Sequence, residues 1–492
     1  MNMSTRKFPQ GVAIAFAVVL FTAALVVAGC TAIGNAVNPI NPITPSSTAV
    51  PVSITDAPGD QVLAASLTLN SIVLTDAAGK TASILSAPIT FEAAHLDAVQ
   101  EPLFTPAIPE DTYTSVALTY SNAEVTYLDP TTKKPVQAAA TLENTGQTVT
   151  FPTPIVVNNA TTTLLVDYLV ANSVTISGST VTVTPDFHIA PIPVPPTPTT
   201  GVNGLQCGIQ GKVTALGANS FTLTLPSGTP LVIDVNSSTQ YQGLSGFSGL
   251  AVGALVEVDV ITQTNGALLA ARVEQQVPPN ATAEMLVGPV TAVTGSPATS
   301  FTQVVRQKIG PTPSTTPIET DTITVNGSTA FLFPGRFATV SATAAAPALP
   351  FAADFSASTL FAGQVVSVAT NGVTNNAATA NSVALAPQTV DGTITGIYPP
   401  VNNVVPNWAK TVIALPSGSW LATVTGQSSV TVYTPIGCPT AAGCYLQQIN
   451  STPPAVGNTI RFNGFLFKNS GSLVMVALVQ ADGPGTPIGP NP

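Results

Sequence analysis

Serine nucleophilic catalysis is the first chemistry to test against this sequence. A nucleophile elbow has the pattern Gly-x-Ser-x-Gly directly after a strand. The nearest match is Gly-Phe-Ser-Gly-Leu at residues 246–250, which lacks the final glycine. A Ser-His-Asp triad would have to use His95 or His188, and neither lies in a pattern typical of a triad. The sequence therefore gives a serine hydrolase little support.

Paired carboxylates, as in glycosidases, are the second chemistry to consider. Glu92 with Asp97, and Glu110 with Asp111, are candidates only because they are close in sequence. Isolated acids in loops usually face solvent or cap turns, so we expect no catalytic pair. The sequence also lacks a P-loop and a Gly-x-Gly-x-x-Gly that opens a helix, so nucleotide chemistry has no support.

Two aspartates, Asp56 and Asp60, surround the tight turn Asp-Ala-Pro-Gly-Asp. One reading is a weak calcium site, because Ca²⁺ prefers hard oxygen ligands. The other is an Asx-turn, in which Asp56 accepts backbone N–H bonds. Zinc is not expected, since there are two histidines and no Cys-x-x-Cys. We predict no cofactor.

Sugar binding is a third chemistry, which would depend on exposed aromatic side chains. Trp408 and Trp420 are the only tryptophans and could form a stacking platform. Two tryptophans in a small β domain are more often part of its core or rim. Both readings stay open at this point.

The first thirty residues are typical of a secretory signal. Arg6 and Lys7 precede an apolar stretch over residues 11–28, and small residues come before Cys30. An uncleaved transmembrane helix is the alternative, because the stretch could nearly span a bilayer.

Val27, Ala28, Gly29 and Cys30 resemble a bacterial lipobox. That resemblance implies that Cys30 is lipidated and becomes the new N-terminus. Each buried CH₂ of an acyl chain, such as palmitate, contributes ~0.8 kcal/mol, so several chains anchor a protein stably. Thr31, where an Asp would favour the inner membrane, implies the outer membrane.

The other cysteines suit an oxidising compartment. Cys438 and Cys444 enclose a turn-like loop that a disulfide could close. Cys207 is left over, and we expect it to be a small buried residue.

The composition favours an exported β protein. Charged residues make up 7% of the chain, against roughly 25% in ordinary soluble proteins. With 45 prolines and 37 glycines, turns are frequent and long helices are not expected. Thirteen basic residues against 23 acidic ones argue against nucleic acid as a partner.

Period-two patterns predict an all-β fold with an N-terminal β-sandwich and about three small β-barrel or sandwich modules. Clear examples are residues 67–74, residues 115–120 and a hairpin at residues 173–183. Repeated units open at Gly211, Gly288 and Gly392, and we expect them to follow one another as separate beads on a string.

The predicted organisation has eight parts. They are a cleaved signal helix at 1–29, the lipidated Cys and tether at 30–50, the sandwich at 51–190, a Pro/Thr linker at 191–204, module 1 at 205–276, module 2 at 284–387, module 3 at 388–481 and a flexible tail at 482–492.

Two family resemblances agree with this division. Ser-Ile-Thr-Asp-Ala-Pro-Gly-Asp at residues 53–60, with the later strands at residues 110–116 and 166–168, resembles DUF4382, a domain of unknown function. The repeats resemble DUF5666, small β domains frequent in bacterial lipoproteins, and module 1 matches best. Neither family has an established activity to carry over.

We therefore expect a non-catalytic, lipid-anchored envelope protein of the outer membrane, with a role in binding, adhesion or scaffolding. Its partners would be the membrane, through Cys30, and a glycan or protein of the envelope. A carbohydrate-binding lipoprotein is the first alternative, and an uncharacterised hydrolase the second.

Overall fold

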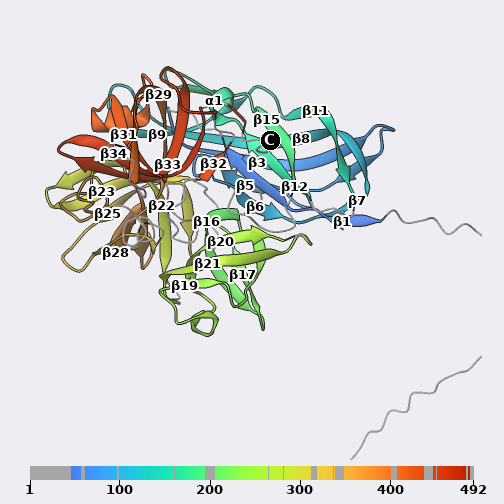
Figure 1. Cartoon of the computed structure of the whole chain (residues 1–492), viewed down its shortest axis with the longest axis horizontal. Coiled ribbons are helices and arrows are strands. Elements are labelled where there is room, and N and C mark those ends of the chain that lie inside the picture. The colour runs from blue at the N-terminus through green and yellow to red at the C-terminus, as the bar shows by residue number, and fades with distance from the viewer. Residues whose placement is uncertain are drawn as a thin grey trace, which may run out of the picture. The chain divides into compact units, whose positions relative to one another are not determined.

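The computed structural model describes residues 46–492, apart from residues 57–60, 97–98, 159–161, 194–204, 264, 281, 312–317, 336, 338–347, 401–406, 437–446, 450–451, 484–485 and 488–492. Strands make up nearly all its regular structure, which confirms the all-β prediction (Figure 1). Within the described part of the chain, no helix is long and apolar enough to cross a membrane. The predicted signal peptide, the lipobox and Cys30 lie outside the described residues.

An N-terminal β-sandwich contains the two longest strands, β3 (Val62–Asp76) and β8 (Asp111–Leu128). They pair in a sheet of order β11-β8-β3-β4, and a second sheet has the order β15-β12-β2-β6. Buried side chains of both sheets form one core, in which the rings of Tyr168 and Phe187 stack with centroids 4.9 Å apart. The other elements are β1 (Ser47–Ala49), β2 (Val52–Asp56), β4 (Thr81–Ser83), β5 (Ile89–Glu92), β6 (Glu101–Phe104), β7 (Ala107–Pro109), β9 (Pro135–Ala139), β10 (Thr141–Leu142), β11 (Gly146–Val157), β12 (Thr162–Tyr168), α1 (Val170–Ser173), β13 (Val174–Ser177), β14 (Thr180–Val183) and β15 (Phe187–Pro193).

Both ends of the sandwich extend beyond the predicted limits. Strand β1 lies in the predicted tether and pairs with β7, and Ser46 and Thr48 donate hydrogen bonds to the Glu110 carboxylate next to β7. Strand β15 includes Pro191 and Pro193 of the predicted linker. Prolines are tolerated there because β15 is the edge strand of its sheet.

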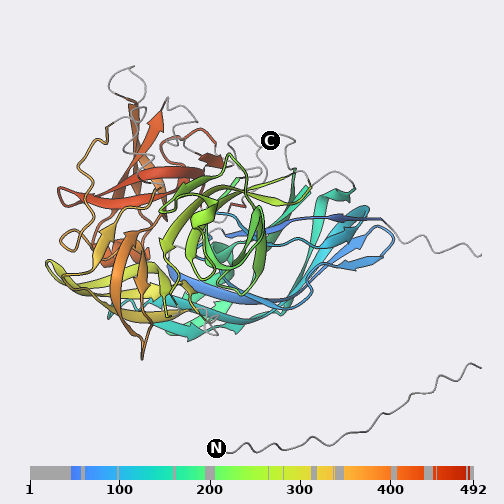
Figure 2. The same ribbon diagram turned by 90° about the horizontal axis from the view of Figure 1, so that it is seen from below.

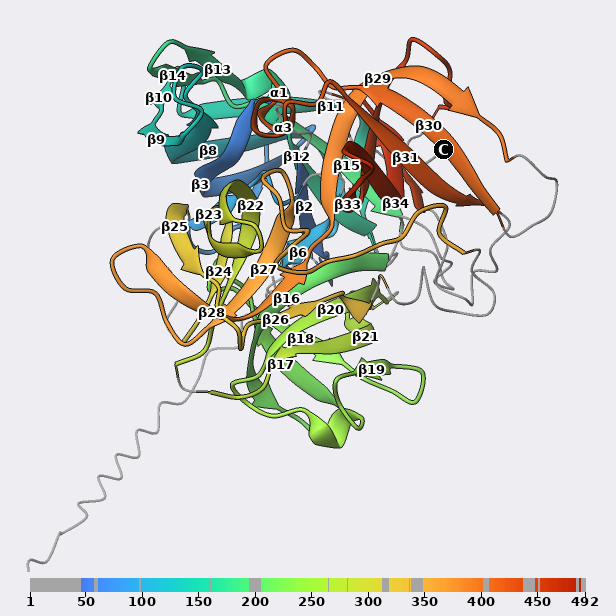
Figure 3. The same ribbon diagram turned by 90° about the vertical axis from the view of Figure 1, so that its left-hand side faces the viewer.

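Each of the three modules is a closed five-stranded barrel. In module 1, the first strand β16 pairs with β17 and β20, and the third strand β18 closes the ring by pairing in parallel with β21. Modules 2 and 3 repeat this ring order, first-second-third-fifth-fourth, with β22–β28 and β29–β34 (Figure 3). The order is that of a Greek-key barrel of the OB type, and closure removes exposed sheet edges. Figure 2 shows the green strands of module 1 around their ring.

The strands of the three modules lie between Leu205 and Asp482. Module 1 has β16 (Leu205–Leu216), β17 (Ser220–Thr224), β18 (Pro230–Asp234), β19 (Gln240–Gln242), the 3-10 helix η1 (Phe247–Gly249), β20 (Leu255–Thr262) and β21 (Leu268–Val277). Module 2 has β22 (Glu284–Gly295), β23 (Ala298–Val305), β24 (Gln307–Ile309), β25 (Glu319–Thr324), β26 (Ala330–Leu332), β27 (Val365–Thr370) and β28 (Ala377–Leu385). Module 3 has β29 (Gln388–Tyr398), β30 (Asn407–Ala414), α3 (Trp420–Thr425), β31 (Ser429–Ile436), β32 (Gln447–Ile449), β33 (Thr459–Asn469) and β34 (Ser472–Asp482).

The glycine that opens each repeat has a steric reason. Just after Gly288, between Pro289 and Val290, β22 leaves its pairing with β27 and joins β23. A Cβ atom on Gly288 would lie 1.9 Å from the carbonyl oxygen of Val304. The corresponding distance is 2.4 Å from Gly392 to Ala414 O and 2.7 Å from Gly211 to Thr224 O. The first strand of each barrel thus bends against the second, and the bend leaves no room for a side chain.

The modules are not separate beads, which corrects that prediction. One hydrophobic cluster joins Leu165 and Ile192 of the sandwich to residues of modules 2 and 3. Another contains Leu63 and Ala64 together with core residues of module 3. The core of module 1, by contrast, uses only its own side chains. The prediction of separate modules is wrong because the outer faces of modules 2 and 3 are apolar and bury one another.

We expect Gly288→Ala to lower the stability of the full chain by roughly 1–3 kcal/mol or more, because the backbone must move to admit the methyl group. Gly327→Ala is the matched control, since nothing lies within 4 Å of a Cβ there. Urea denaturation of both variants checks this, and equal losses of stability would contradict the steric explanation.

Candidate functional site

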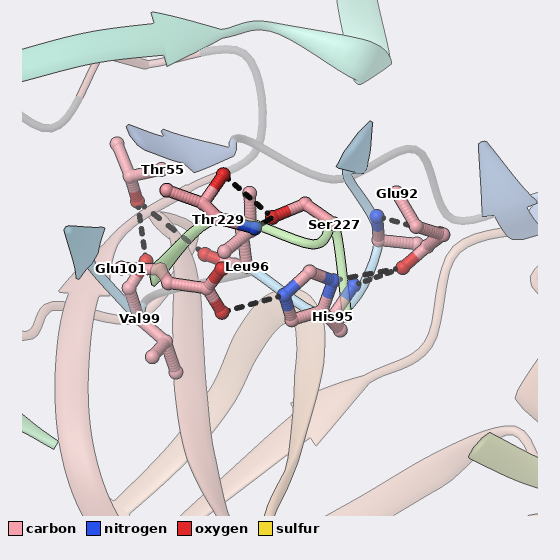
Figure 4. Close-up of polar contacts among 9 residues, drawn as sticks. Thr55, Glu92, His95, Leu96, Val99, Glu101, Ser227 and Thr229 are labelled. Carbon is pink, nitrogen blue, oxygen red and sulfur yellow. Dashed lines mark hydrogen bonds and ion pairs between the residues drawn. The ribbon is translucent and has the colours of Figure 1, made fainter. Parts of the chain in front are cut away.

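A short turn between β5 and β6 carries the only buried histidine-carboxylate cluster that we find among the described residues. Glu92 fixes this turn: its Oε1 accepts hydrogen bonds from the backbone N–H groups of Ala65 and Ala94, both at 2.9 Å. Its Oε2 accepts from the backbone N–H of His95 at 3.0 Å. From β2, the Thr55 hydroxyl donates to the carbonyl oxygens of Leu96 and Val99 (Figure 4). The turn is therefore fixed before its side chains meet any ligand.

The imidazole of His95 lies between two carboxylates (Figure 4). Nδ1 is 3.0 Å from Oε2 of Glu92, and Nε2 is 3.3 Å from Oε2 of Glu101. Burial alone lowers the pKa of His95, but hydrogen bonds and charge attraction from Glu101 and Glu92 outweigh burial and raise the pKa to about 9. His95 is thus a cation at neutral pH.

Two basic residues of module 2 lie next to this cluster. Arg306 donates from Nε to Leu63 O at 2.6 Å and from Nη1 to Ala94 O at 3.1 Å, so it binds the same turn. Lys308 is held by Glu319, with 2.9 Å between Nζ and Oε1, and lies 4.0 Å from Glu284.

These groups line a cavity of about 360 Å³, which we call the charged cavity. Its walls include Phe91, Glu92, His95, Glu101, Arg306 and Lys308. Both signs of charge are present and fixed in place by ion pairs or backbone contacts. Such a surface can orient a polar ligand.

A second cavity of about 90 Å³ shares His95, Glu101, Arg306 and Gln307 with the first. We call it the amide cavity, because Gln100, Gln210, Gln307, Gln388 and Asn463 line it. These residues come from the sandwich and from all three modules. The cavity therefore exists only in the assembled chain.

The cluster can hold charge but is poorly suited to moving a proton. A general base needs an unprotonated nitrogen near its substrate. His95 keeps its proton at neutral pH, and both ring nitrogens are engaged by carboxylates. The Glu92 carboxylate accepts three backbone N–H groups besides the imidazole.

The structure describes both members of only one acid pair singled out from the sequence, Glu110 and Asp111, and gives them different partners. Glu92 contacts His95, and its suggested partner Asp97 lies outside the described residues. Glu110 accepts from Ser46 and Thr48, whereas Asp111 lies 3.7 Å from Lys80. Glu110 lies in the bend between β7 and β8, and Asp111 is the first residue of β8, so the two acids meet different partners.

Asp56 is fully buried at the end of β2, and its Oδ1 accepts a hydrogen bond from the backbone N–H of Val170 at 3.1 Å. It therefore holds the start of α1. Asp60 and the turn itself lie outside the described residues, so the calcium site and the Asx-turn both stay predictions. Among the residues that the structure describes, no group of three His, Cys, Asp or Glu side chains could hold a metal ion.

Both tryptophans are core residues. Trp408 is 7% exposed and donates from Nε1 to Ala348 O. Trp420 is 9% exposed and lies in the core that module 3 shares with Leu63 and Ala64 of the sandwich. They cannot form a sugar-stacking platform. Cys207 is half-buried in the wall of the amide cavity, so it is less buried than expected. Cys438 and Cys444 lie outside the described residues.

The sequence analysis missed Glu101, Arg306 and the glutamines of the amide cavity. Glu92 and His95 are three residues apart in a turn, a spacing that lets two side chains meet and that could have indicated their contact. Arg306 lies between β23 and β24, more than two hundred positions away, and no local pattern marks it.

We expect the stability of the protein to fall as the pH rises from about 6.5 to about 9. A histidine whose pKa is raised on folding contributes its full stabilisation below pH 6.5, the pKa in the unfolded chain. This contribution is lost as the pH rises to about 9, the pKa in the folded protein. The shift from 6.5 to about 9 corresponds to roughly 3 kcal/mol. In thermal unfolding measured as a function of pH, His95→Gln should lack this fall of stability, and His188→Gln should show the same fall as the wild type. A wild-type protein equally stable at pH 6.5 and pH 9.5 would contradict the ion-pair geometry.

Comparison with known proteins adds one family match. Residues 210–274 match the family described as "Domain of unknown function (DUF5666)", which covers most of module 1. No curated protein matches the chain. Module 1 is thus similar to a DUF5666 domain, in agreement with the closed barrel that has its own core.

Proposed function

We propose that this chain is a non-catalytic binding protein of the bacterial cell envelope, and that the charged cavity is where it binds its ligand. The observation that carries the proposal is the state of His95, a half-buried cation with a carboxylate on each ring nitrogen. Enzymes tune such groups toward neutral pKa values so that protons can move. Here the pKa moves away from neutrality, which favours a fixed pattern of charge.

The ligand should be small and polar. The cavity of about 360 Å³ lies within the range of small-molecule sites. Phe91 gives it one apolar wall, and the carboxylates and cations around it offer partners to groups of either sign. Carbohydrate is the second candidate, because five-stranded barrels of this order bind oligosaccharides in other proteins. That argument rests on analogy between folds alone, and the two tryptophans give it no support because they are buried.

The anchor is part of the same proposal. Residues 1–29 would be a cleaved signal, Cys30 would be lipidated, and the sandwich would be a DUF4382-like domain that follows the tether. The support is the lipobox-like sequence and the position of a DUF5666 match in the same chain.

We expect Cys30→Ala to abolish labelling by radioactive palmitate and to release the protein from the outer-membrane fraction. A protein that is still membrane-bound and labelled after this substitution would contradict lipidation at Cys30. Protease treatment of intact cells then separates a surface location, where the wild type is cleaved, from a periplasmic one, where it is protected.

Ligand binding is tested with Glu101→Gln, which removes one charge from the cavity wall. Glu143→Gln is the matched control, because Glu143 is exposed on the sandwich. On glycan and short-peptide arrays, wild type and Glu143→Gln should bind the same compounds, and Glu101→Gln should bind them about tenfold more weakly, or ~1.4 kcal/mol. Unchanged binding by Glu101→Gln would exclude the charged cavity. Turnover of an arrayed compound that Glu101→Gln abolishes would overturn the non-catalytic assignment.

A further inference from the structure

We propose that the amide cavity binds a neutral amide group, such as that of a peptide bond or an N-acetylated sugar. This inference goes beyond the proposed function, and it depends neither on the lipid anchor nor on binding in the charged cavity.

Two buried glutamines in the wall of this cavity each have one polar atom without a hydrogen-bond partner. Gln100, just before β6, and Gln210, in β16, are each 7% exposed and line the cavity. The side-chain Nε2 of Gln100 and Oε1 of Gln210 are buried without a hydrogen-bond partner. Leaving a buried polar atom unpaired costs about 1–3 kcal/mol, so the two atoms call for a partner that the folded chain does not supply.

The two unpaired atoms are complementary to an amide. Gln100 offers a donor, which a carbonyl oxygen accepts, and Gln210 offers an acceptor, which an N–H group reaches. An amide carries both groups on one rigid plane. An ester, which has the carbonyl but no N–H, satisfies only Gln100.

The other walls are already paired and hold their positions. Gln388 accepts from Val365 N at 2.8 Å and donates to Gly363 O at 2.8 Å. Asn463 donates to the Thr389 hydroxyl at 3.0 Å. These contacts join β29 to β33 and to the start of β27, so the cavity is shaped before a ligand enters.

The charge of the walls favours a neutral ligand. Glu101 is paired with His95, and Glu257 is 2.6 Å from Nη2 of Arg272. With His95 protonated, the acids Glu101 and Glu257 balance the cations His95 and Arg306 in the lining. An ion would enter this cavity without an opposite charge to compensate its lost hydration.

The size also fits. A water-sized group needs ~15 Å³ of such volume, so about 90 Å³ holds roughly six of them. That exceeds one amide unit and is less than a large side chain or a disaccharide. The ligand would therefore insert its amide, with the rest of the molecule outside.

The test uses the full-length protein in detergent micelles and acetamide as the minimal probe, with methyl acetate as the isostere that lacks an N–H. Saturable binding of acetamide by ligand-observed NMR, at least about tenfold tighter than methyl acetate, is the expected result. N-acetylglucosamine against glucose, and N-acetylglycine methylamide, then distinguish a sugar from a peptide as the source of the amide.

Gln100→Met and Gln210→Met should each weaken acetamide binding about tenfold while unfolding at the same temperature as wild type or higher, since no protein hydrogen bond is lost. Gln303→Met is the control: its amide donates to Leu286, Gly288 and Val366 away from the cavity, so stability should fall and binding should not. If no amide binds up to its solubility limit, or if both cavity variants bind like wild type, the cavity holds only water and the proposal is wrong.

Discussion

The structure depends most on the buried ion pairs of His95 with Glu92 and Glu101. A carboxylate removed from water is costly unless charge and hydrogen bonds compensate it, and Glu92 receives both from one turn. That turn presents the Ala94 carbonyl to Arg306, which also binds Leu63 O. The cation on His95 thus stabilises the turn on which module 2 docks, and removing it would leave two buried acids unpaired.

Polar contacts to the sandwich recur in each module. Gln206 of module 1 donates to the Ser53 hydroxyl at 2.9 Å, and Arg461 of module 3 donates to Asp56 O at 3.4 Å. Backbone carbonyls and hydroxyls replace carboxylates as acceptors, which explains how a chain with 7% charged residues holds its modules together. Both cavities occur at these junctions.

The sequence predicted what local patterns determine. Alternation found β3, β8 and the hairpin at β13 and β14, and the glycines at 211, 288 and 392 located the barrels because each barrel needs that bend. The sequence could not predict the two cavities. Gln100 and Gln210 line one cavity only after the sandwich and module 1 pack, and Arg306 reaches the turn of the sandwich from module 2. Nor could it show that modules 2 and 3 share a core, since an apolar outer face has the same alternation as an inner one.

The most direct measurement is nitrogen-15 NMR of the histidine rings, with His188→Gln to assign the remaining signal. The account predicts that both ring nitrogens of His95 are protonated at pH 7.5 and that the ring titrates near pH 9. A neutral tautomer at pH 7.5, with titration near pH 6.5, would mean that His95 is available as a base, and the non-catalytic reading of this site would fail.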